Sequence, residues 1–404
     1  MAAEKPASNY AQILKSSSVM GGAQILGYLI STVRTKVIAV LIGPSGVGLL
    51  GLYVSATELI GNLARLGIND SGVREVAEAQ GSGDSDRVAH TIKTLRRVCW
   101  LTGIAGWLLT AALAYPLSLW AFGTADRAWS VTILGSTLLF GAISGGQTAL
   151  LQGTRRIGDV ARLNVLSGAA ATVVGAAIYA VLREDGIVPV LICTAIINLG
   201  LSWTLSRSIH TADVQQSWSQ TFRQSRRLIT LGLAFMWSAL LGSIVALGIR
   251  SLIVRHLGLD ANGIYQAAIG ISTIFGGLVL GAMSTDFYPH LTATVRDHAA
   301  ATRLVNDQTE IGLLLALPGL QATLAFAPWL VRLFYSGDFI SGSALLPWYV
   351  VSVLCRMVTF PLGYVLVAKG AGARYALITS GFHIINLAGC AILIPRRDSW
   401  GGNP

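Results

Sequence analysis

Four arginines of this sequence lie inside long apolar stretches, where a charged side chain is costly. A charge at the centre of a membrane helix costs about 2.5–3.5 kcal/mol on insertion scales, so such a residue usually faces a cavity or a partner. Guanidinium groups bind phosphate through two parallel hydrogen bonds. We therefore expect a basic, water-accessible site that binds a polyanion, lined by Arg34, Arg65, Arg250 and Arg356.

Glu58 is the one acidic residue well inside such a stretch, and it belongs to a polar stripe. Asn62, Arg65 and Asn69 follow it at steps of four, three and four residues. At about 100° per residue, these side chains fall within roughly 60° of arc on one helix face. That face either lines water or packs on another polar helix. Glu58 accordingly has two readings: it pairs with Arg65 through Asn62, or it is a protonatable coupling residue.

Further polar residues accompany the arginines. Arg34 is on the same side of its stretch as Gln24, although its side chain could also reach the membrane surface by snorkelling. Gln266 heads an uncharged stripe in a later stretch, and we expect it, like Gln24, to line the same site. The balance of four arginines against one carboxylate favours an anion over an organic cation as the ligand.

The elements that position these residues are membrane helices. Of the 404 residues, 53% are hydrophobic and only 12% are charged, about half the charged fraction of a globular protein. Apolar runs near twenty residues long recur, the length that a helix needs to cross a bilayer. We predict an all-α polytopic membrane protein with eleven spans, at about 19–42, 47–68, 98–122, 130–152, 164–182, 187–206, 228–254, 263–285, 311–335, 344–366 and 376–394.

The basic residues predict the orientation of these spans. Alternate connections, starting with the N-terminal segment, hold 18 Lys and Arg, whereas the connections on the other side hold five. Cytoplasmic loops carry this excess, so we expect a cytoplasmic N-terminus and no removable signal peptide. The net charge of +10 comes largely from this asymmetry, and we expect no nucleic-acid partner.

The four cysteines predict neither a metal nor a redox centre. Cys99, Cys193, Cys355 and Cys390 are isolated, without CxxC or Cys/His spacing. We expect packing thiols and no cofactor.

Glycines indicate an internal repeat with an offset of 215 residues. Gly43 aligns with Gly258, Gly48 with Gly263 and Gly61 with Gly276, whereas Arg34 and Arg250 fall one position out of register. Six spans precede the second copy, so both copies enter the membrane in the same direction. Parallel repeats of this kind are typical of transporters that bind substrate between their halves.

The repeat predicts two bundles around a central cavity. We expect an N-terminal six-helix bundle at 1–206, a cytoplasmic linker at 207–227 and a C-terminal bundle at 228–404. The linker places Trp218 and Phe222 so that they could enter the membrane interface as an amphipathic turn. Residues 84–97 could form a similar surface helix. We expect both segments to serve as topology determinants rather than as binding sites.

With these residues in view, the chain resembles the polysaccharide transporter branch of the multidrug/oligosaccharidyl-lipid/polysaccharide exporter (MOP) superfamily. It looks most like the O-antigen flippases (the Wzx type). The resemblance is carried by "GPSGVGLLGLYVSATELIGNLARLGINDSGVREVAE", "GIYQAAIGISTIFGGLVLGAMSTDFYPHL" and "LFYSGDF" at 333–339. It covers most of residues 10–394 through diffuse patterns of glycine and apolar residues.

The resemblance implies a transporter rather than an enzyme. It implies two six-helix bundles that export an undecaprenyl-pyrophosphate-linked oligosaccharide across the bacterial inner membrane for lipopolysaccharide biosynthesis. It also implies coupling to an ion gradient, of protons or sodium. A polymerase and a chain-length regulator of the same pathway are the implied partners. Members commonly carry cavity arginines, and Arg34 and Arg250 match that pattern by place. The family typically has twelve or more spans, so eleven spans and the tail "PRRDSWGGNP" predict a truncated C-terminal bundle.

Two rival functions remain open at this stage. A drug/cation antiporter of the same superfamily would share the architecture, but its cation site would need more membrane acids than one glutamate. An integral-membrane polysaccharide polymerase would be expected to carry a larger outside loop or an acidic catalytic motif, and neither occurs in this sequence.

Overall fold

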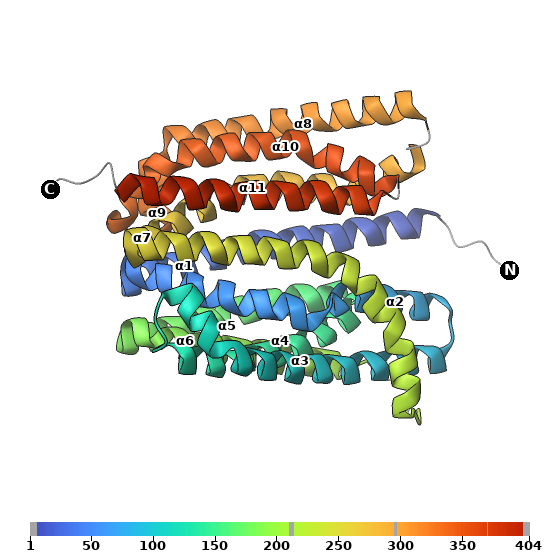
Figure 1. Cartoon of the computed structure of the whole chain (residues 1–404). Coiled ribbons are helices and arrows are strands. Elements are labelled where there is room, and N and C mark those ends of the chain that lie inside the picture. The colour runs from blue at the N-terminus through green and yellow to red at the C-terminus, as the bar shows by residue number, and fades with distance from the viewer. Residues whose placement is uncertain (1–5, 210–213, 295–296, 370, 399–404) are drawn as a thin grey trace. The chain divides into compact units, whose positions relative to one another are not determined.

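The computed structural model describes residues 6–209, 214–294, 297–369 and 371–398, and within these ranges the chain is helical without strands (Figure 1). The α-helices are α1 (Pro6–Arg65), α2 (Ile68–Gly81), α3 (Ser85–Phe122), α4 (Ala128–Gly153), α5 (Ile157–Leu182), α6 (Ile187–Ser206), α7 (Trp218–Thr294), α8 (His298–Ala325), α9 (Ala327–Phe334), α10 (Leu346–Ala368) and α11 (Gly372–Asp398). Two 3₁₀ turns, η1 (Arg183–Gly186) and η2 (Gly337–Leu345), follow α5 and α9.

The two longest helices, α1 and α7, are each broken at a glycine. Gly43 has φ 65° and ψ −172° inside α1, and Gly258 has φ 86° and ψ 174° inside α7. Once the two parts of each broken helix are counted separately, most of the predicted spans lie on one long helix each, whereas the span predicted at 311–335 crosses from α8 into α9. Gln24–Arg65, 42 residues in all, is thus divided at Gly43 into two parts of about 30 Å each, close to the hydrocarbon thickness of about 30 Å.

Length and composition support membrane insertion across the described ranges. Seven helical sections are long and apolar enough to cross a bilayer, or eight if α8 and α9, which meet at an angle of 85°, form one broken span. Several sections, such as Ile157–Ser206 with 50 residues, contain two of the predicted spans. The prediction of an all-α polytopic membrane protein is confirmed.

The chain forms two compact units. The first contains the chain up to Leu41 together with Leu52–Leu247, and the second contains Ile42–Gly51 together with the chain from Gly248 onward. The predicted bundle limits, 1–206 and 228–404, stay a prediction.

The first unit is built around α4. In it, α3 and α6 both pack on α4, α5 packs on α6, and α2 packs on α3 and α4 (Figure 1). A buried cluster that includes Ile68, Ile92 and Leu150 joins α2, α3 and α4. The first part of α1 is tied to the end of α5, because Arg183 donates from Nη1 to the Leu41 carbonyl at 3.2 Å. The first unit is thus held together by apolar packing around α4 and by a hydrogen bond from the end of α5 to α1.

Residues 84–97 do not form a separate surface helix, so that prediction is wrong. The side chain of Asp84 accepts from the backbone amides of Asp86 and Arg87 and caps a single helix, α3, that continues to Phe122. No glycine or proline lies between Ser85 and Thr102. The capped helix therefore continues past residue 97 into the apolar part of α3. The amphipathic helix of this region is instead α2.

The segment after residue 213 is attached to α3. Lys93 donates to the Val214 carbonyl, and Arg97 donates to the Gln216 carbonyl at 3.0 Å. The Arg97 guanidinium also lies over the Trp218 ring, 4.6 Å from its centroid. Trp218 and Phe222 are exposed. The second half of the predicted linker is therefore an ordered part of the first unit.

In the second unit, α8, α10 and α11 lie along one another, with α10 in contact with both neighbours (Figure 1). Leu280 of α7 packs with residues of α8 and α10 in a buried cluster that includes Leu320 and Met357. This unit also contains both glycine turns of the repeat.

The two turns contact each other reciprocally. A Cβ on Gly48 would lie 2.2 Å from the Leu259 carbonyl oxygen, and a Cβ on Gly263 would lie 2.0 Å from the Pro44 carbonyl oxygen. Pro44 and Leu259 are themselves equivalent at the offset of 215 residues. Asn262 adds a hydrogen bond, donating from Nδ2 to the Gly48 carbonyl at 2.7 Å. The repeat predicted from the glycines is confirmed at these turns, where equivalent backbones approach too closely for a side chain.

Candidate functional site

The polar stripe of the first unit lies on the second part of α1. Glu58 is exposed, and Asn62 is half-buried. Asn62 donates from Nδ2 to the Ser243 hydroxyl oxygen of α7 at 2.7 Å. Asn62 is thus used to join two helices, and it does not bridge Glu58 to Arg65 as one of the two predicted readings required.

Arg65 is held against its own helix. Its Nε donates to the Gly61 carbonyl at 3.1 Å, and a Cβ on Gly61 would lie only 2.5 Å from Nη2. Glu58 interacts electrostatically with this guanidinium. The absence of a side chain at Gly61 therefore allows Arg65 to fold back along α1, on the same face as Glu58.

Asn69 does not continue the stripe, so the prediction of one helix face from Glu58 to Asn69 is wrong. Helix α1 ends at Arg65, and Leu66 and Gly67 both have left-handed backbones, with φ 49° and 65°. Asn69 is in the first turn of α2, where its amide group packs against Gly145 of α4. A glycine that accepts a positive φ ended the helix before the 3.6-residue period could bring Asn69 into line.

Arg34 lies half-buried on the first part of α1, and Gln24, ten residues earlier, is exposed. The Arg34 guanidinium lies near the Tyr179 hydroxyl group of α5. The structure therefore gives Arg34 a polar neighbour inside its own unit and leaves Gln24 on an exposed surface of the same helix.

In the second unit, Arg250 and Gln266 are paired. Arg250 donates from Nη2 to Oε1 of Gln266 at 2.7 Å, across the break in α7. Gly51 lies next to both: a Cβ there would be 3.5 Å from Gln266 Oε1 and 3.8 Å from Arg250 Nε. Two of the predicted residues, from helices on either side of a glycine turn, are thus brought together.

Arg356 lies on an exposed face of α10. Ser352 and Thr359, one turn away on either side, are exposed too. The Thr359 hydroxyl donates to backbone carbonyls of its own helix. Within its unit, Arg356 remains apart from the Arg250–Gln266 pair in the hydrogen bonds that the structure describes.

Two polar partners were missed by the sequence reasoning. Ser243 bonds Asn62 across 181 residues of chain, and Tyr179 lies near Arg34. The only signal for Ser243 was its position two turns before Arg250 on one face. Nothing in the sequence singled out Tyr179, because an aromatic residue in an apolar helix is ordinarily a packing residue.

Comparison with known proteins gives this arrangement a context. The model of a family described as "Polysaccharide biosynthesis protein" matches residues 13–295. The chain is 23% identical over 378 residues to the Lipid III flippase of Escherichia coli (strain K12) and to that of Shigella flexneri, covering 91% of this chain and 88% of each relative.

Solved structures show the same fold at low identity. An inward-facing multidrug resistance MATE family transporter of the MOP superfamily matches with a TM-score of 0.63 and 16% identity, over 90% of this chain and 84% of the other. A MOP superfamily transporter from Pyrococcus furiosus matches with a TM-score of 0.62 and 15% identity, over 93% and 88%. The resemblance to this superfamily is confirmed. Because the family model spans more than half of a chain that folds as a MOP transporter does, the chain belongs to the polysaccharide biosynthesis protein family.

Proposed function

We propose that this protein is a flippase that moves an undecaprenyl-pyrophosphate-linked oligosaccharide across the bacterial inner membrane by alternating access, with its N-terminus in the cytoplasm. The Lipid III flippases among its relatives support a lipid-linked glycan as the substrate class. The finer assignment, to the O-antigen repeat unit, is part of this proposal. Translocation makes and breaks no covalent bond, so the chain needs binding groups rather than catalytic ones.

The observation that carries the proposal is the set of arginines on membrane helices, together with how they are held. The hydrogen bond to Gln266 orients the Arg250 guanidinium. Arg65 bonds the Gly61 carbonyl through Nε, so we expect its two terminal nitrogens to bind the anion. A guanidinium whose orientation is already set loses less entropy when it binds phosphate. We assign the pyrophosphate to these arginines together with Arg34 and Arg356.

The polar residues around the arginines would serve the sugars and the energy coupling. Amide groups such as those of Asn62, Asn69, Gln24 and Gln266 hydrogen-bond hydroxyl groups as both donors and acceptors. Glu58 is exposed and interacts with Arg65. We therefore assign Glu58 the role of sensing a proton or sodium ion, since its charge state would change the hold of Arg65 on an anion.

The test replaces single arginines with glutamine. Arg34→Gln and Arg250→Gln are each expected to lower surface display of the O-antigen at least about tenfold in a strain that depends on this protein, because each removes a charge-assisted contact. Arg332→Gln is the matched control, since Arg332 is an exposed arginine of α9 outside the proposed site. Normal display by either site variant at equal protein level would overturn the assignment of that arginine.

Glu58 has a separate test. Glu58→Gln should slow transport and flatten its dependence on pH or sodium, measured as uptake of lipid-linked glycan into the far leaflet of proteoliposomes under an imposed gradient. Unchanged transport with an unchanged response to the gradient would remove Glu58 from the coupling role and leave the arginine site standing.

The same strain separates the rival functions. A drug/cation antiporter predicts altered drug sensitivity with intact surface polysaccharide, and a polymerase predicts translocated but unlengthened repeat units. Several solved structures with this fold are of multidrug transporters, but identities of 14–16% to them show the fold alone. Four arginines against one acid continue to favour the anionic substrate.

A further inference from the structure

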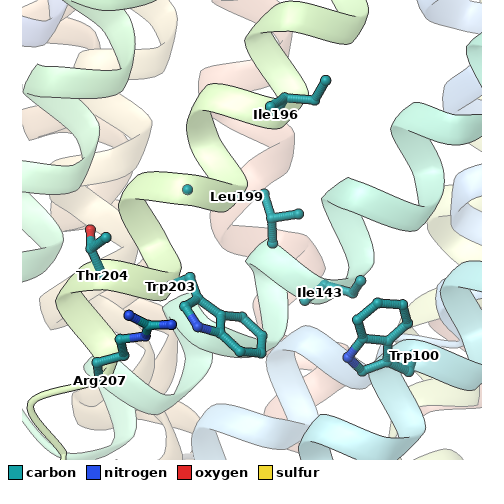
Figure 2. A pocket seen from close by; sticks show the side chains of 8 residues that line it. Trp100, Ile143, Ile196, Leu199, Trp203, Thr204 and Arg207 are labelled. Atoms are coloured by element: carbon teal, nitrogen blue, oxygen red, sulfur yellow. The ribbon is translucent and has the colours of Figure 1, made fainter.

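The first unit has an apolar groove whose residues have no role in the proposed transport function. It has a volume of about 430 Å³ and lies between α3, α4 and α6 (Figure 2). Its walls come from Trp100, Ile143, Ile196, Gly200 and Trp203, and Arg207 lies at one end. None of these residues belongs to the polar stripe or to the arginine site.

The groove has the length of one bilayer leaflet. Along α6 it runs from Ile196 to Arg207, eleven residues or about 16 Å of helix. The hydrocarbon core of a bilayer is about 30 Å thick, so a single leaflet contributes about 15 Å. An acyl chain that enters beside Arg207 would therefore reach Ile196 near the middle of the membrane.

The chemistry of the groove changes along its length. The end farthest from Arg207 is aliphatic, and its Ile196 side chain is 49% exposed. Two tryptophans, Trp100 and Trp203, lie toward the other part, where Figure 2 shows the Arg207 guanidinium extending beside the Trp203 ring. Tryptophan is enriched at the membrane–water interface. The order aliphatic, aromatic, cationic matches the acyl chain, glycerol region and phosphate of a lipid.

Arg207 supplies the charge complementarity. It is exposed at the end of α6, and its guanidinium makes no hydrogen bond to another residue within the described ranges. Its neighbour Ser208 is bonded to Arg156, which in turn pairs with Asp159, so that arginine is already engaged. Arg207 is thus the cation at this mouth that remains for a lipid phosphate.

We propose that this groove binds one anionic phospholipid of the cytoplasmic leaflet, with an acyl chain between α3 and α6 and the phosphate on Arg207. The cytoplasmic leaflet carries the anionic lipids, and residues 207–227 are expected on that side. The proposal needs the membrane fold but not the proposed substrate, because the binding site consists only of residues of the first unit.

Gly200 provides a direct test of the apolar half. A Cβ at Gly200 meets nothing within 4 Å, so Gly200→Leu can fill the groove without disturbing the helix. Gly158→Leu is the matched control, since Gly158 of α5 is also exposed with open space around it. For the headgroup, Arg207→Gln is compared with Arg155→Gln, an exposed arginine outside the groove.

The readout is lipid retained by the intact purified protein in native mass spectrometry, titrated with phosphatidylglycerol or phosphatidylcholine. The wild type should retain one phosphatidylglycerol about tenfold more tightly than phosphatidylcholine. Arg207→Gln should remove this preference, Gly200→Leu should remove both adducts, and both controls should behave as the wild type.

Two results would overturn the proposal. Full lipid retention by Gly200→Leu would show that the lipid binds elsewhere. An unchanged headgroup preference in Arg207→Gln would show that Arg207 does not bind the phosphate. A third arm adds undecaprenyl phosphate as competitor. Displacement of phosphatidylglycerol at an equimolar ratio would identify a polyprenyl chain as the occupant and would also overturn the assignment to phospholipid. Since none of these arms measures transport, failure here would leave the proposed function untouched.

Discussion

The two copies of the repeat share their turns and differ in their linings. At the turns, Gly43 and Gly258 have the same non-helical backbone, and Gly48 and Gly263 make the same close approach to the other copy. On the helices that follow, Glu58, Asn62 and Arg65 of the first copy correspond to Thr273, Gly277 and Leu280 of the second. The framework is duplicated, whereas the charged face that holds Glu58 and Arg65 occurs in one copy.

Position 280 shows the difference most clearly. Arg65 is half-buried and anchored on Gly61. Leu280, its counterpart, is only 9% exposed and packs with Leu320 and Met357. The same repeat position therefore belongs to a candidate binding face in one unit and to an apolar core in the other.

The largest expected effect comes from giving the second copy the charge of the first. Leu280→Arg should lower the free energy of unfolding by about 4 kcal/mol, because it removes a packed side chain and places a guanidinium in an apolar cluster. The shift is measured by SDS-induced unfolding in mixed micelles. Arg65→Leu, the reverse change, should leave stability nearly unchanged while transport falls. Equal stability of Leu280→Arg and wild type would contradict the core assignment.

The next effect tests the reciprocity of the turns. Gly48→Ala and Gly263→Ala should each destabilise by about 3 kcal/mol, because the new methyl group would meet a carbonyl oxygen that must move. Gly277→Ala, where a Cβ has open space, is the control. The measurement is the free energy of unfolding of the three variants. A large difference between Gly48→Ala and Gly263→Ala would show that the two turns do not contact each other equivalently.

A smaller effect is expected at the break in each helix. Gly43→Ala and Gly258→Ala should each lower the free energy of unfolding by about 1–2 kcal/mol, since a positive φ with an extended ψ is accessible almost only to glycine. Thermal unfolding in detergent would report the loss. Gly22→Ala, at a helical glycine with open surroundings, should be neutral or stabilising.

The smallest effect concerns the hydrogen bond between Asn62 and Ser243, which the second copy cannot make. A double-mutant cycle with Asn62→Ala and Ser243→Ala should give a coupling energy near 0.6 kcal/mol, the usual size for a hydrogen bond between membrane helices. Additive losses in the same SDS assay would show that the two side chains do not interact in the protein.

The sequence predicted the parts of this fold that depend on composition and on local pattern. Apolar runs located the long helices, because hydrophobicity is a property of each residue. The spacing of glycines located both turns, because glycine is the residue that most readily accepts a positive φ. The break after Arg65 was missed, although Gly67 was in view, since a helical period says nothing about where a helix stops. For α3, a helix beginning near residue 84 was predicted, but its continuity with the apolar span from residue 98 was missed, although no glycine or proline lies between Ser85 and Thr102 to end it.

The candidate site was predicted by residue type but not by partner. Arg250 and Gln266 are sixteen residues apart and meet because α7 turns back at Gly258. Ser243, by contrast, reaches Asn62 only through tertiary packing, which no spacing rule contains. The expected truncation of the second bundle stays a prediction, and the match to the Lipid III flippases covers 88% of their length.

The contact between Gly48 and Gly263 has a consequence for how such a protein can diversify. Main-chain atoms of the two turns meet there directly, so the fit depends on a few glycines, and Asn262 adds one side-chain hydrogen bond. Substitutions along the rest of both helices can then alter what is carried without disturbing this joint. A search for remote kin would do better to weigh the spacing of these glycines than the charged positions around them.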